Sequence, residues 1–131
     1  MRYIGVLLLM FFLVAGASAQ DKSKTPVKEM SYSGYVIDEM CGSGMVKKTD
    51  SMQKVAAHTR DCALSKSCAA SGFGLFSEGK WVAFDKKGSA MAQSMLEKSK
   101  REDHLYAEVD GTMKGKILVV KSIKEADPPK N

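Results

Sequence analysis

Three cysteines and one histidine are the residues of this chain best suited to chemistry. Cys41 follows a β-branched stretch, His58 and Cys62 lie four positions apart, and Cys68 comes soon after them. On a helix, a spacing of four puts two side chains on one face. Three sulfurs and one nitrogen form a tetrahedral set that zinc accepts, and sulfur also suits monovalent copper. We therefore predict a zinc or copper site made by Cys41, His58, Cys62 and Cys68.

A structural disulfide is the alternative use of these cysteines. Outside the cytosol thiols tend to oxidise. The simplest pair is Cys62 with Cys68, although Cys41 could pair with either of them. An odd number of cysteines leaves one thiol over, so a disulfide-linked dimer could also form. The sequence alone leaves the metal site and the disulfide both open.

Catalysis is not predicted from these residues. Cys62 beside His58 meets the minimum requirement for a thiol nucleophile. The sequence offers no oxyanion motif and no third residue that would orient the pair, and a free thiol on an exported protein is open to oxidation. We therefore predict a binding domain and not an enzyme.

The first nineteen residues have the layout of a secretory signal peptide. Arg2 precedes an apolar run at 4–14, and Ala17-Ser18-Ala19 gives an A-x-A cleavage pattern. The run is shorter than the roughly 20 residues needed to span a bilayer. We therefore predict cleavage after Ala19, no transmembrane anchor in the mature protein, and export to the periplasm or the medium.

Length and composition limit the chain to one small domain. Its 131 residues are 44% hydrophobic and 27% charged, which excludes a multidomain enzyme. We expect a flexible lead-in at 20–30, a single domain at 31–124 and a tail at 125–131. The 20 Lys and Arg residues exceed the 15 Asp and Glu residues only slightly, so nucleic acid is not the expected partner of an exported protein. A metal ion or a component of the cell envelope is expected instead.

Strand and helix signals predict a mainly β domain with two helices. Strands are expected at 32–38, 73–77, 80–85, 105–110 and 116–123, and helices at 50–64 and 88–101. The cysteine-bearing segment 39–71 is then a helical insert. Five strands with a helix between the third and the fourth match the order of a small OB-like barrel. The alternative is an α+β mixed sheet with the helices on one face.

An OB-like barrel also predicts a binding surface. Barrels of this type use exposed aromatic side chains for stacking against ligands. Phe76, Trp81 and Tyr106 are the candidates, since they fall on or beside the predicted strands. An envelope component would bind there if the cysteines serve only as a structural staple.

The motifs together resemble those of small exported bacterial domains of unknown function. The similarity covers residues 34–123, with G-Y-V-I-D-x-x-C-G at 34–42, H-x-x-x-C at 58–62, the further Cys68 and a hairpin containing E-G-K-W. The resemblance implies an OB-like fold, a signal peptide, and a G-T-x-x-G turn at 111–115 before the final strand. It implies no biochemical role, and the spacing between Cys62 and Cys68 is wider than the resemblance predicts.

Overall fold

The structure is a computed structural model that describes residues 28–130. The predicted signal peptide and most of the predicted lead-in lie outside these residues. The elements follow in the order β1 (Met30–Asp38), α1 (Glu39–Met45), α2 (Ser51–Ala56), α3 (Arg60–Ala63), α4 (Lys66–Ser71), β2 (Phe73–Ser77), β3 (Lys80–Phe84), α5 (Lys86–Lys98), β4 (Tyr106–Lys114) and β5 (Ile117–Glu125). Among the described residues, no helix is both long and apolar enough to cross a membrane.

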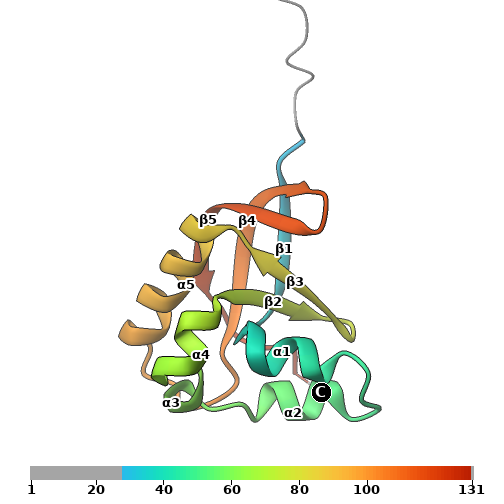
Figure 1. Cartoon of the computed structure of the whole chain (residues 1–131). Helices are drawn as coiled ribbons and strands as arrows, with labels where there is room; N and C mark the ends of the chain where they lie inside the picture. The colour runs from blue at the N-terminus through green and yellow to red at the C-terminus, as the bar shows by residue number, and fades with distance from the viewer. Residues whose placement is uncertain (1–27, 131) are drawn as a thin grey trace, which may run out of the picture.

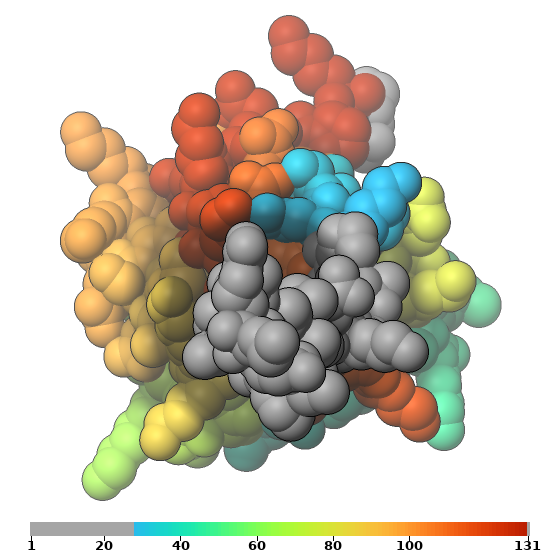
Figure 2. Space-filling model, turned by 90° about the horizontal axis from the view of Figure 1, so that it is seen from above, coloured from blue at the N-terminus to red at the C-terminus, as the bar shows by residue number. Residues whose placement is uncertain are grey.

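Five strands form a mixed sheet that closes into a ring (Figure 1). Their order is β1-β2-β3-β5-β4, and β4 pairs back with β1. Only the β3–β5 pair of this ring is parallel. Figure 2 views the molecule from above, where the start of β1 lies beside the β4–β5 hairpin, with Met30 opposite Gly111. The five strands and the helix between β3 and β4 were predicted from the sequence.

The helix content differs from the prediction. The described residues contain five helices where two were expected, so the domain is not mainly β. Helices α1 to α4 gather at one end of the ring. Helix α5 packs elsewhere, against β5 at the side of the ring (Figure 1). The helices therefore do not share one face, as the alternative mixed-sheet fold would require.

The turn predicted at 111–115 is also displaced. β4 continues to Lys114, and the turn follows at Gly115, whose φ of 61° is the left-handed conformation that glycine adopts readily. At Asp110-Gly111 the structure has a register shift against β5. Asp-Gly is typical of hairpin turns and glycine is also typical of bulges, so the local pattern could not distinguish the two.

Two hydrophobic clusters bury both faces of β1. Val36 belongs to the cluster that fills the ring beneath α5. Tyr35 and Ile37 belong to a second cluster, with Val55 and Phe76, on the side of the insert helices. This alternation follows from the two-residue period of a strand. The insert helices and the ring together enclose the end of β1. The side chain of Asp38, which follows Ile37, is therefore also buried.

Asp85 fixes α5 to the ring. Its Oδ1 accepts hydrogen bonds from the backbone N–H of Gly88, at 3.1 Å, and of Val120, at 3.0 Å. The first bond caps the helix, and the second ties the cap to β5. The helix therefore starts at Lys86, two residues before the predicted start at 88.

Candidate metal centre

Asp38 and Gly42 together position Cys41. Asp38 is fully buried at the end of β1, and its Oδ1 accepts a hydrogen bond from the Cys41 backbone N–H at 3.0 Å, which caps α1. Gly42 lies against the Trp81 ring, where an added Cβ would come within 2.5 Å of Trp81 Cδ1. The D-x-x-C-G motif is thus a helix cap followed by a close contact, and both fix the start of α1.

His58 lies between two helices and not within one. The helix predicted at 50–64 is broken into α2 and α3, and Thr59 caps α3 by accepting a hydrogen bond from the Cys62 N–H at 3.2 Å. The segment before β4 supports the break, because the His104 N–H donates to the Ala56 carbonyl at 2.7 Å. The predicted helical face shared by His58 and Cys62 is therefore wrong, since tertiary hydrogen bonds replace helical ones here.

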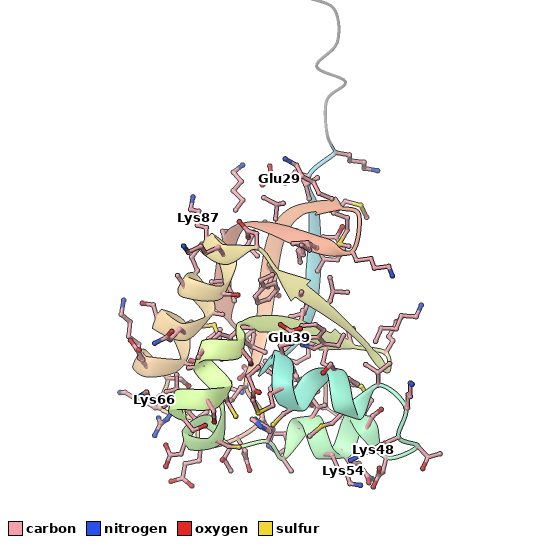
Figure 3. The ribbon with its side chains drawn as sticks, viewed as in Figure 1. Glu29, Glu39, Lys48, Lys54, Lys66 and Lys87 are labelled. Atoms are coloured by element: carbon pink, nitrogen blue, oxygen red, sulfur yellow. The ribbon has the colours of Figure 1, made fainter. Side chains whose placement is uncertain are left out.

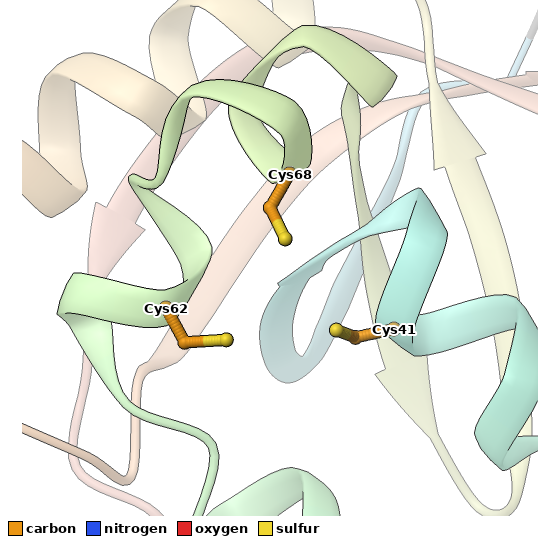
Figure 4. A group of neighbouring side chains, drawn as sticks. All are labelled: Cys41, Cys62 and Cys68. Atoms are coloured by element: carbon orange, nitrogen blue, oxygen red, sulfur yellow. The ribbon is translucent and has the colours of Figure 1, made fainter.

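The sulfur atoms of the three cysteines converge. Cys41 comes from α1, Cys62 from α3 and Cys68 from α4, and their side chains point toward one another (Figure 4). All three Sγ atoms lie within 4.8 Å of one another. All three are free thiols. Cys68 is buried, Cys41 is half-buried and Cys62 is exposed, so the cluster lies at the protein surface with one side inside.

A second group of donor atoms shares Cys41. Ligand atoms of Asp38, Cys41 and His58 also lie within 4.8 Å of one another. His58 belongs to this group and not to the sulfur group, so the predicted quartet is divided between two triads that share Cys41, and the second triad also contains Asp38. Asp38 is the residue that sequence reasoning missed as a ligand. Its position at the end of a strand buried on both faces could have indicated it.

Burial and negative charge change the protonation of the thiols and the imidazole. Burial, followed by the Asp38 carboxylate and the neighbouring thiols, raises the pKa of Cys41 to about 12. Burial and Cys68 also raise the pKa of Cys62. Burial lowers the pKa of His58, although Asp38 opposes this effect. Without a cation Cys41 and Cys62 therefore stay protonated, and His58 is neutral at pH 7, which is the form that binds metals.

The predicted aromatic surface is not formed as expected. Phe76 is 0% exposed, because the insert helices cover the outer face of β2. Trp81 is half-buried between Gly42 and Gly74, where a Cβ would lie 2.6 Å from Trp81 Cε2. The three residues therefore do not form one exposed stacking face.

Tyr106 remains partly accessible at a neighbouring cavity. It makes an edge-to-face contact with Tyr35, at a centroid distance of 5.1 Å, and both rings line a cavity of about 690 Å³. Pro128 and Pro129 of the tail also line this cavity. The tail is tied down there, because the Ala126 N–H donates to the Tyr106 carbonyl at 2.9 Å.

Basic side chains around the insert face the solvent. Lys48 between α1 and α2, Lys54 on α2 and Lys66 on α4 are exposed and point outward (Figure 3). Lys54 forms an ion pair with Asp50 at 2.7 Å, one helical turn away. Exposed pairs of this kind contribute little to stability. These lysines form the outer surface of the insert, whereas the donor groups lie on its inner side.

No protein family model, curated protein or solved structure matches this chain.

Proposed function

We propose that this protein is an exported binding domain that holds a soft metal ion, zinc or copper, through Cys41, Cys62 and Cys68. The observation that carries the proposal is the convergence of three free thiols from three different helices within 4.8 Å. Tetrahedral bonds of about 2.3 Å from one zinc ion would place two sulfurs about 3.8 Å apart. The sulfur atoms are therefore near the separation that one shared ion requires.

The electrostatics of the cluster support a cation. Ionising three thiols beside the Asp38 carboxylate would bring several negative charges together in a partly buried site. Burial, followed by this repulsion, raises the pKa of Cys41. A bound cation reverses that preference and deprotonates coordinating thiols. The raised pKa also disfavours Cys41 as a nucleophile, because the thiolate is the reactive form. We therefore favour binding over catalysis.

Alkylation of cysteines, read by mass spectrometry, tests the proposal. Protein loaded with zinc under reducing conditions should resist alkylation at all three cysteines, because metal-bound thiolates are shielded. The same protein treated with a chelator and a denaturant should react at all three. Equal alkylation with and without zinc would contradict the proposal.

A disulfide staple between Cys62 and Cys68 is the second candidate. The observation that favours it is the same proximity, since two sulfurs within 4.8 Å need only a small shift to bond. The protein would then be a structural or envelope-interaction domain, with the cavity beside Tyr106 as its binding face. Denatured, non-reduced monomer would then show one reactive cysteine, Cys41, per chain. A dimer linked through Cys41 on a non-reducing gel would show none.

The fold supports an OB-type barrel as the scaffold of this site. The closed order β1-β2-β3-β5-β4, with α5 between β3 and β4, is consistent with that architecture. The metal-binding insert would then be an addition between the first two strands.

Export is proposed from the sequence at 1–19 alone. Cleavage after Ala19 would give a mature protein that begins at Gln20. We expect N-terminal sequencing of protein recovered from the envelope fraction or the medium to start at this residue. A start at Met1, or recovery only from the cytosol, would contradict export.

A further inference from the structure

We propose a second metal site at Asp38, Cys41 and His58, in which the Cys41 thiolate bridges two ions. This inference rests on the proposed function, because the first ion is the one bound by the three cysteines. The second site would take a divalent ion such as zinc, which accepts oxygen, nitrogen and sulfur donors together.

Unsatisfied buried groups point to this site. Oδ2 of Asp38 and both ring nitrogens of His58 are buried without a hydrogen-bond partner among the described residues. The Asp38 side chain is 0% exposed and that of His58 is 7% exposed. Leaving a buried polar group unpaired destabilises the folded state, and leaving a charged group unpaired does so more strongly. Three such atoms on two side chains that lie next to each other in space indicate that something else binds them.

The geometry between the two residues fits a shared ion better than a hydrogen bond. Asp38 Oδ2 and His58 Nε2 are 3.5 Å apart. This exceeds the usual N–H···O distance of about 2.7–3.2 Å. Two donors bound to one zinc ion at about 2.0–2.1 Å in tetrahedral geometry are separated by about 3.3–3.4 Å. The pair therefore lies close to the separation of two ligands of one ion.

Cys41 connects the two sites. It is the one residue that belongs to both donor groups, while His58 and Asp38 do not join the group of Cys62 and Cys68. A thiolate sulfur has enough lone pairs to bind two cations at once. A bridging Cys41 would also relieve the repulsion between its own charge and the Asp38 carboxylate, because a cation would lie between them.

Native mass spectrometry of zinc-titrated protein tests the second site. Reduced wild-type protein should bind two zinc ions per chain. Asp38→Asn should bind one, because its amide oxygen can still cap α1 but is a poor replacement for the carboxylate ligand. His58→Gln should likewise bind one. The control His104→Asn changes an exposed histidine outside the cluster, at a position with φ of 50° that asparagine tolerates, and should keep two.

The outcomes separate the two proposals. One zinc ion per chain in the wild type, or two that persist in Asp38→Asn, would overturn the second site and leave the cysteine site standing. No bound zinc in the reduced wild type would overturn both. Circular dichroism of each variant checks that it is folded, and Asp38→Asn decides the matter if His58→Gln does not fold.

Discussion

Saturating zinc should raise the melting temperature of the reduced protein by about 10–20 °C. A ligand that binds only the folded state stabilises it by about 2.7 kcal/mol when its free concentration is about 100 times Kd. For a domain of this size, 1 kcal/mol corresponds to about 4–8 °C. The cysteines lie on α1, α3 and α4, so one ion would cross-link three separate short helices. Calorimetry with and without zinc measures the effect.

Cys41→Ser should abolish this zinc-dependent shift. Cys41 belongs to both donor groups, so its loss removes a ligand from each of them. Serine is similar in size, and the cap from Asp38 to the residue 41 backbone N–H does not depend on the side chain. Ser43→Ala, an exposed position on the same helix, is the matched control and should keep the full shift. An equal shift in Cys41→Ser and Ser43→Ala would contradict the metal site.

Gly42→Ala should lower the free energy of unfolding by about 2 kcal/mol. The new Cβ would lie 2.5 Å from Trp81 Cδ1 and 3.0 Å from Ile37 Cγ2. The Trp81 ring cannot simply retreat toward Gly74, because a Cβ added at Gly74 would also lie only 2.6 Å from the ring, so the backbone is close on that side too. Overpacking of this kind typically costs about 1–3 kcal/mol. Urea denaturation followed by the fluorescence of Trp81, the only tryptophan of the chain, measures the loss.

Gly44→Ala is the matched control on the same helix. An added Cβ at Gly44 meets nothing within 4 Å. Alanine is favoured over glycine in a helix by about 0.5–1 kcal/mol, so this variant should be unchanged or slightly more stable. Equal stability of the two variants would show that the Gly42–Trp81 contact does not position α1. Zinc affinity should fall in Gly42→Ala alone, since only this change displaces the helix that carries Cys41.

The strands were predictable because their signals are local. The stretch at 32–38 is β-branched and aromatic, and Glu78-Gly79 marks the hairpin between β2 and β3. The helix after β3 was predictable from its helical periodicity, although Asp85, which caps it, was placed in the predicted strand at 80–85. These elements depend little on the rest of the chain.

The helices of the insert could not be predicted as well as the strands. Its break at His58 depends on a hydrogen bond from His104 to Ala56, which are far apart in sequence. The burial of Phe76 and Asp38 depends on the insert covering the outer face of the ring. The residue types identified the cysteine cluster, but its division into two triads follows only from the tertiary arrangement.

X-ray absorption at the copper edge tests the convergence of the three thiols most directly. Protein loaded anaerobically with one equivalent of copper(I) presents a soft ion that prefers sulfur donors. A shell of three sulfur atoms around copper is the expected result, and it should lose one sulfur in Cys68→Ser. A shell dominated by nitrogen and oxygen, or one unchanged in Cys68→Ser, would contradict a metal centre built by Cys41, Cys62 and Cys68.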